Sequence, residues 1–404
     1  MVIEGFRVLL GGKTVAHLYA RGDYTWLEWQ QGYWEDPDRP ILGLRFEDNP
    51  KERVAAALRL PPWFSNLLPE GRLRQWVALD AGINEQREMR LLVRLGLGLP
   101  GAVIVEPVEG EADPTWRPEQ VQFPAVRRHD GQVLRFSLAG VVLKFSLLQS
   151  GDRLTLPAGN QEGDWIVKMP DGVYPEVPVN EFAMMTLAQR CGIDVPEIKM
   201  WHRDELPTLP GMAWPKEQEW AYAIRRFDRE GNSRIHIEDL AQVRGFYPDR
   251  KYDGSFETAA ALVYRRRDEA SYLEFVRRLF FSFAIGNGDM HLKNTSLIYR
   301  DPRRPVISPA YDLVSTAPYR MDGSEDLGLK LGRSKRFDEV SPQSFELLAR
   351  KIGAPVESTM QTVAEVAGQL AGSWPGVSQL MDKLPHHREW LDLRLPEISR
   401  RFAN

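Results

Sequence analysis

The sequence predicts an α+β protein in which a β-rich lobe precedes a helical lobe, with a further α+β domain in front of both. Short apolar segments with strand-like alternation dominate residues 131–228. From about residue 236 onward, helical periodicity prevails instead. A proline-rich stretch without periodicity, residues 110–128, resembles a linker. The expected bounds are residues 1–110 for the first domain, 111–130 for the linker, 131–235 for the β-rich lobe and 236–404 for the helical lobe.

Composition excludes several classes of protein. The chain has 404 residues, of which 52 are Lys or Arg and 56 are Asp or Glu, so its net charge is −4. This charge argues against binding of nucleic acid through an overall positive surface. Cys191 is the single cysteine, so no internal disulfide can form, and the seven histidines lack zinc-motif spacing. No apolar run approaches 18 residues and the start lacks signal-peptide order. We therefore expect a cytoplasmic protein without a membrane span.

The first domain is expected to open with a β-hairpin. FRVLL and TVAHLYA have strand character, and Gly11-Gly12-Lys13 between them suits the positive φ of a tight turn. The GGKT here is not a phosphate-binding loop, because that motif needs a glycine where Arg7 stands. An amphipathic helical stretch follows over residues 63–97, interrupted at residues 69–71, and GAVIVEPVEG closes the domain as a strand.

The β-rich lobe is expected to consist of short strands around one helix. The helix NEFAMMTLAQRCG has Asn180 as candidate N-cap and Gly192 as its stop. The strand AYAIRRFD ends this lobe near residue 228. The strands before the helix are predicted at VLRFSLA, VVLKFSL, RLTL and DWIVKMP.

The helical lobe is expected to contain one β-hairpin among its helices. TSLIY and PVISPAYDL are its strands, and RDPRRP is its turn. The helices are predicted at SFETAAALVYRRR, SYLEFVRRLFFSFAIG, SPQSFELLARKIG and MQTVAEVAGQLAG.

The stretch GNGDMHLKN concentrates polar groups directly after an apolar helix. Asp289 and Asn294 have the D-x-x-x-x-N spacing of a kinase catalytic loop, in which the acid accepts the nucleophile's proton and the amide binds Mg²⁺. The hairpin that follows brings back a second acid, Asp312. Lys168 on its strand is placed like the lysine that pairs with ATP phosphates, and Glu181 on the next helix could orient it.

Each of these residues also has a structural explanation when taken alone. Asp289 could serve a turn, Asn294 an Asx-turn, and Lys168 could face solvent from its strand. His291 could support the loop through a hydrogen bond or touch a phosphate, and both roles stay open. The order lysine strand, acid-bearing helix, D-x-x-x-x-N, hairpin and second acid is what favours phosphoryl transfer.

These motifs together resemble the HipA family of bacterial serine/threonine protein kinases, the toxin half of HipA–HipB pairs. The match runs nearly from end to end, and GNGDxHxKN is specific within that family. The motifs that carry the resemblance are FSNLLPEG, RFSLAGVVLK, IVKMP, NEFAMMTLA, IRRFDR, HIEDLAQVRGFYPDRKYD, GNGDMHLKN and PAYDLVS. The fold it implies is the bilobal protein-kinase-like fold with an extra amino-terminal domain.

The resemblance implies a role for each matched position. Asp289 becomes the catalytic base, Asn294 and Asp312 the holders of Mg²⁺, and Lys168 the partner of the ATP phosphates. Ser137 matches the serine that family members autophosphorylate, an event that ejects the phosphate-binding loop and inactivates the kinase.

Two positions depart from the family pattern. The phosphate-binding loop runs from Gly140 to Lys144, the lysine that closes it, and the apolar residues 141–143 stand between them. Backbone N–H groups could still hold phosphate there. The interlobe segment carries Arg225 where an acid is frequent, so adenine contacts would rest on backbone groups and Phe227.

The function implied is a Mg·ATP-dependent protein kinase that arrests growth as a toxin. Its substrate would be a host protein, with translation factors and aminoacyl-tRNA synthetases as candidates. Its partner would be a HipB-like DNA-binding antitoxin, so DNA would be contacted only indirectly. Two rivals are a small-molecule phosphotransferase of the aminoglycoside-kinase type and a non-catalytic pseudokinase that acts as antitoxin partner and corepressor.

Overall fold

A computed structural model describes residues 2–110, 112–118, 144–150, 153–155, 162–207, 214–215, 217–320 and 325–403. Ser137 and Gly140 lie outside these described residues. The chain divides into two compact units: unit 1 holds Met1–Val141, Asp228–Lys251 and Ile298–Pro305, and unit 2 holds Val142–Phe227, Tyr252–Leu297 and Val306–Asn404. Across the described ranges, no helix is long and apolar enough to cross a membrane.

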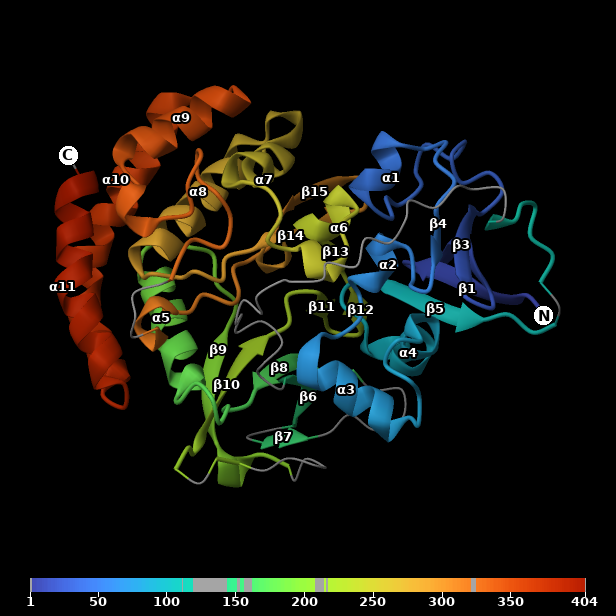
Figure 1. Cartoon of the computed structure of the whole chain (residues 1–404), viewed down its shortest axis with the longest axis horizontal. Helices are drawn as coiled ribbons and strands as arrows, with labels where there is room; N and C mark the ends of the chain where they lie inside the picture. The colour runs from blue at the N-terminus through green and yellow to red at the C-terminus, as the bar shows by residue number, and fades with distance from the viewer. Residues whose placement is uncertain are drawn as a thin grey trace. The chain divides into compact units, whose positions relative to one another are not determined.

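Unit 1 is built on a five-stranded sheet with the order β4-β3-β2-β1-β5 (Figure 1). The predicted first hairpin is confirmed, since Gly11 and Gly12 have φ of +58° and +78° and reverse the chain between β1 and β2. The chain then continues into a third antiparallel strand. The strands are β1 (Glu4–Leu10), β2 (Lys13–Arg21), β3 (Tyr24–Trp29), β4 (Ala55–Ala57) and β5 (Val103–Pro107).

Short helices cover this sheet and complete the core of unit 1. Their predicted interruption at residues 69–71 is confirmed, because α2 ends at Ser65 and α3 begins at Gly71. Trp63, Phe64, Leu91 and Leu92 are all buried in one cluster with side chains of the sheet. The helices are α1 (Leu44–Asp48), α2 (Pro62–Ser65), α3 (Gly71–Asp80) and α4 (Glu88–Leu95).

Two later segments of the chain, residues 228–251 and 298–305, also belong to unit 1. The fully buried carboxylate of Glu238 accepts hydrogen bonds from the backbone N–H of Leu44 (2.9 Å), from Trp63 Nε1 (3.1 Å) and from the hydroxyl of Tyr299. Burial raises the pKa of Glu238 to about 7, against the opposing effect of these donors. The elements of the later segments are β11 (Arg229–Glu230), β12 (Ser233–Arg234), β13 (His236–Asp239) and α6 (Leu240–Arg244).

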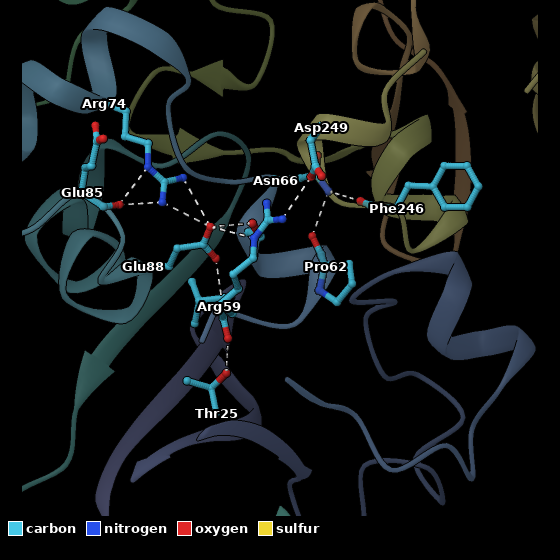
Figure 2. A network of polar contacts seen from close by, with 11 residues as sticks. Thr25, Arg59, Pro62, Asn66, Arg74, Glu85, Glu88, Phe246 and Asp249 are labelled. Atoms are coloured by element: carbon cyan, nitrogen blue, oxygen red, sulfur yellow. Dashed lines mark hydrogen bonds and ion pairs between the residues drawn. The ribbon is translucent and has the colours of Figure 1, made fainter. Parts of the chain in front are cut away.

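A second buried carboxylate, Glu88, holds the entry to α4 in place (Figure 2). It accepts hydrogen bonds from the backbone N–H of Leu60 (2.8 Å) and from Ser65 Oγ (3.1 Å). It also pairs with the guanidinium groups of Arg74 (3.2 Å) and Arg59 (3.4 Å). One carboxylate therefore joins α4 to α3 and to the chain around α2.

Replacement of Glu88 by alanine should destabilise unit 1 by about 3–5 kcal/mol, because the buried N–H of Leu60 and hydroxyl of Ser65 lose this acceptor and Arg74 loses its paired acid. The measurement is urea unfolding of the full chain, with hydrogen exchange followed over residues 60–95. Glu106→Ala is the matched control: this acid pairs with Arg7 at the surface, with side chains about half exposed, and its loss should cost below about 1 kcal/mol. Equal effects of the two substitutions would contradict the role of Glu88.

Unit 2 contains a second five-stranded sheet, β7-β6-β8-β10-β9, and the helix α5 (Val177–Arg190) that packs on it. The interpretation of Asn180 as N-cap is wrong. The helix begins one turn earlier, with Glu176 as its cap, and Asn180 is buried within it. Its side chain donates to the carbonyl of Ser315 (2.9 Å) and accepts from that residue's N–H (3.0 Å). The strands are β6 (Lys144–Ser150), β7 (Arg153–Thr155), β8 (Trp165–Lys168), β9 (Ile198–His202) and β10 (Trp220–Arg225).

Five further helices belong to unit 2. Phe280 of α8 packs against Phe345 of α9 and Phe402 of α11, with ring centroids 5.7 and 5.1 Å away. The four predicted helices are present, and α11 comes in addition. They are α7 (Phe256–Val263), α8 (Glu269–Ala284), α9 (Pro342–Ile352), α10 (Val356–Ser373) and α11 (Pro385–Phe402).

The predicted hairpin in the helical part is confirmed as β14 (Ser296–Asp301) and β15 (Arg304–Ile307). With β13 it forms the sheet β13-β14-β15. Short 3-10 helices punctuate the chain at Gly96–Gly98, Arg203–Glu205, Pro248–Arg250, Arg265–Arg267, Leu292–Asn294, Ala317–Tyr319, Phe337–Glu339, Trp374–Gly376 and Ser378–Met381.

Candidate active site

In the loop that follows α8, both the backbone N–H and the backbone carbonyl of Asp289 are hydrogen-bonded. The N–H of Asp289 donates to Asn287 Oδ1 (3.0 Å), and Asn294 Nδ2 donates to the carbonyl of Asp289 (2.9 Å). The predicted D-x-x-x-x-N spacing is thus one closed turn that ends in the 3-10 helix Leu292–Asn294. The side-chain nitrogen of Asn294 donates the hydrogen bond that closes the turn. Its side-chain oxygen, Oδ1, is an oxygen ligand of the type that Mg²⁺ prefers.

Close packing against a later segment holds this loop. The N–H of Gly288 donates to Thr316 Oγ1 (2.7 Å), and the same hydroxyl donates to Glu325 Oε1 (3.0 Å). A Cβ on Gly288 would overlap the side chain of Glu325, and one on Gly328 would overlap the carbonyl of Met290. Glycine is therefore required at both positions by space, and the chain around residues 325–328 lies directly on the loop.

Lys168, Glu181 and Asp312 form one partly buried ionic cluster, in which the side chain of Asp312 is 29% exposed. Lys168 Nζ, at the end of β8, donates to Glu181 Oε1 of α5 at 2.5 Å and to Asp312 Oδ1. The side chains of Lys168 and Glu181 are 12% and 2% exposed. The structure thus brings the predicted residue Asp312 to Lys168, 144 positions earlier in the sequence, and to its neighbour Glu181.

The electrostatics of the cluster favour the charged forms of Lys168 and Asp312 but not that of Glu181. Burial alone would lower the pKa of Lys168, but Asp312 and Glu181 raise it well above its usual range. Burial would raise the pKa of Asp312, yet Lys168, Lys144 and other neighbours lower it to about 2. Burial raises the pKa of Glu181 to about 7 although Lys168 opposes this. The two acids hold the ammonium group of Lys168 in one orientation. A charged donor fixed in this way is suited to bind a phosphate oxygen.

Lys144 reaches the same cluster from the neighbouring strand. It lies opposite Lys168 in the antiparallel register of β6 and β8, so both side chains project from one face of the sheet. Its positive charge lowers the pKa values of Asp312 and Glu181. Lys144 is exposed, and the predicted phosphate loop before it, with Gly140, lies outside the described residues.

Asp312 has a backbone conformation that few residues adopt. Its φ is +58°, in the left-handed region, which Asp and Asn tolerate better than other residues with a side chain. Non-glycine residues held in this region often mark functional sites. This conformation changes the direction of the chain directly after Tyr311. At this point the carboxylate of Asp312 contacts Lys168.

His291 belongs to the same loop as Asp289 and Asn294. It is buried, its ring packs edge-on against Tyr252 with centroids 5.0 Å apart, and its charge contributes to the lowered pKa of Asp312. Sequence reasoning missed Tyr252, whose hydroxyl donates to Asp289 Oδ1. The tyrosine is 37 residues from Asp289 and no spacing rule connects the two.

Two aromatic rings lie where the interlobe segment ends. Phe227 and Tyr311 are both half-buried, with ring centroids 5.8 Å apart. Arg225 is exposed and pairs with Glu197 (3.2 Å). A base could stack on Phe227, and the guanidinium of Arg225 has its own surface partner.

The oxygen atoms at this site suit Mg²⁺ bound together with a phosphate. Asn294 offers an amide oxygen and Asp312 a carboxylate, and Mg²⁺ in such sites takes one or two protein oxygens and completes its shell with phosphate and water. Within the ranges that the structure describes, no group of three or more His, Cys, Asp or Glu could hold a metal ion by itself.

Comparison with known proteins covers almost the whole chain. Residues 136–374 match the "HipA-like C-terminal domain" and residues 6–106 the "HipA N-terminal domain". A Sinorhizobium fredii protein named "Putative kinase Y4dM" is 41% identical over 94% of this chain and 93% of its own length. The "Serine/threonine-protein kinase toxin HipA" of Shewanella oneidensis is 24% identical over 85% of this chain and 81% of its own.

A solved structure shares the fold. A chain in the complex of Shewanella oneidensis HipA, HipB and operator DNA superposes with a TM-score of 0.77 at 20% identity, over 98% of this chain and 97% of that one. The predicted fold class, an α+β kinase-like fold with an additional amino-terminal domain, is confirmed.

Proposed function

Because the chain belongs to the HipA family of kinases, we propose that it is a Mg·ATP-dependent protein serine/threonine kinase. The observation that carries the proposal is the contact of Lys168 with both Glu181 and Asp312. Phosphoryl transfer depends on a fixed cation at the phosphates and on an acid that holds the metal beside it. This cluster supplies both, next to the loop of Asp289.

Each residue of the site then has one task. Lys168 binds phosphate oxygens and Glu181 orients its ammonium group, while Lys144 adds positive charge from the neighbouring strand. Asn294 and Asp312 hold Mg²⁺, and His291 packs on Tyr252 within the loop that carries Asn294. Asp289 accepts the proton of the acceptor hydroxyl. When bound, Mg·ATP supplies the phosphoryl group that this hydroxyl receives.

The nucleotide base is assigned to Phe227 and to backbone groups of the interlobe segment. An aromatic ring offers a stacking surface to any purine, while backbone N–H and C=O groups read its edge. Gly140 is assigned to the phosphate-binding loop, as the resemblance implies. The apolar residues 141–143 leave that loop its backbone N–H groups for phosphate.

The biological setting proposed is that of a toxin in the cytoplasm. The substrate would be a host protein, with translation factors and aminoacyl-tRNA synthetases as candidates. The partner would be a HipB-like DNA-binding antitoxin, as in the Shewanella oneidensis complex of HipA, HipB and operator DNA. The net charge of −4 supports contact with DNA through the partner.

Two other functions have less support. A small-molecule phosphotransferase would not need the amino-terminal domain that residues 6–106 match. A pseudokinase that serves only as corepressor would not need Lys168, Glu181 and Asp312 held in contact. The deciding experiment is transfer of the γ-phosphate from labelled ATP to the protein itself and to a bacterial lysate. Label that requires Mg²⁺ and an intact Asp289 supports the kinase, and no label on either protein source contradicts it.

Ser137 should become phosphorylated when the protein is incubated with Mg·ATP. This serine lies within the matched carboxy-terminal domain, just before Gly140. A phosphate adds about −1.5 to −2 charge at neutral pH, and repulsion by the triphosphate should drive the loop from the site. Mass spectrometry locates the phosphate, and loss of nucleotide binding by the modified protein tests the inactivation. Active protein that never modifies Ser137 would show that this switch is missing here.

A further inference from the structure

We propose that Tyr252 is a positioning residue that holds the carboxylate of Asp289 in the orientation needed to accept a proton. The inference rests on the proposed function, because it concerns the residue that acts as base in it. In the chain, a segment of unit 1 ends at Lys251, and Tyr252 is the first residue of the segment of unit 2 that follows. It reaches the catalytic loop through space, and no motif predicts the contact.

The contacts of Asp289 are divided between its backbone and its side chain. Asn287 accepts from its N–H and Asn294 donates to its carbonyl, so these two amides fix the backbone. Neither contact determines where the carboxylate points, because it can still rotate about its side-chain bonds. The Tyr252 hydroxyl donates to Oδ1 and so constrains the rotation of the carboxylate.

Tyr252 can impose a direction because its own ring is fixed. The side chain is half-buried and packs edge-on against His291, with ring planes 77° apart and centroids separated by 5.0 Å. His291 is itself buried in the loop that carries Asp289. The ring therefore rests on the same loop whose acid its hydroxyl binds, and a general base must be placed within a few tenths of an ångström of its working position.

Tyr252→Phe removes the hydroxyl and leaves the ring on His291. We expect kcat for phosphoryl transfer to fall about tenfold or more, as for loss of a hydrogen bond to a charged group. The KM for ATP, nucleotide affinity by calorimetry and the melting temperature should stay unchanged, because the ring packing and the cluster around Lys168 are intact. Tyr264→Phe is the matched control: that tyrosine is also half-buried in unit 2, but its ring packs on Tyr272.

A double-mutant cycle with Asp289→Asn separates positioning from general damage. If Tyr252 acts through Asp289, its substitution should have no further effect on the residual rate of the Asp289→Asn protein. A further tenfold loss in that background would overturn the proposal, and so would an unchanged kcat in Tyr252→Phe alone. Phosphate on Tyr252 itself would make it an acceptor instead of a positioning residue. Full activity of Asp289→Asn alone would instead refute the proposed function.

Discussion

Replacement of Asp289 by asparagine should lower the rate of phosphoryl transfer by about 10²–10⁴-fold. Asparagine has nearly the same shape and can still accept the hydrogen bond from the Tyr252 hydroxyl, while the backbone contacts to Asn287 and Asn294 are unaffected. What disappears is the carboxylate that takes the acceptor's proton. Transfer of labelled γ-phosphate measures the rate, and calorimetry should show nucleotide affinity within about twofold of the wild type, a range set by the preserved geometry.

An acid elsewhere in unit 2 provides the comparison. Asp338 pairs with Arg336 at the surface, with both side chains about two-thirds exposed, so Asp338→Asn should leave the rate unchanged. If the Asp289→Asn protein kept a third or more of the wild-type rate, another group would have to be the base. The kinase assignment would then lose its central residue.

Replacement of Asp312 by asparagine should abolish the magnesium dependence of nucleotide binding and lower transfer by about 10³-fold, because several kcal/mol of metal-based stabilisation are lost. The substitution keeps a residue that tolerates the φ of +58° at this position. It removes the charge that faces Lys168, which remains paired with Glu181 at 2.5 Å. Calorimetric titration of ATP with and without Mg²⁺ gives the measurement.

Asp312→Ala separates the charge from the backbone conformation. Alanine lacks the charge too, but it also fits the left-handed region less well, so this variant should in addition lose about 1 kcal/mol of stability. Asp312→Asn should melt near the wild-type temperature and Asp312→Ala below it, with equally poor magnesium binding. Normal magnesium-dependent binding by either variant would remove Asp312 from the metal site.

The residues of the site could be proposed from sequence because each belongs to a short motif. Lys168 ends an apolar strand, Glu181 lies on the following helix, and Asp289 and Asn294 have a fixed spacing. Tyr252 lies within the segment HIEDLAQVRGFYPDRKYD, but nothing in that segment indicates its contact with a loop 37 residues later. Local rules also misplaced Asn180: as a frequent N-cap residue it was assigned to the start of α5, yet its side chain is satisfied by the backbone of Ser315, 135 residues away.

The helix α11 shows another limit of sequence patterns. It carries Pro396 in its interior, and proline removes a helical hydrogen bond and usually breaks the periodic pattern. Burial of Leu391, Leu395, Ile398 and Phe402 against neighbouring helices outweighs that cost in the folded chain. The packing partners that decide this are not visible from the segment itself.

The sequence alone determined those features whose cause lies within a few residues. The hairpin at Gly11-Gly12, the helix break at residues 69–71 and the order of the catalytic motifs are all local. Tertiary structure decided that residues 228–251 and 298–305 join unit 1, where Glu238 bonds to Leu44, Trp63 and Tyr299. It likewise decided that Lys168 contacts Glu181 and Asp312 together. A buried charge must find its hydrogen-bonding partners wherever the folded chain places them, and that placement depends on the whole core.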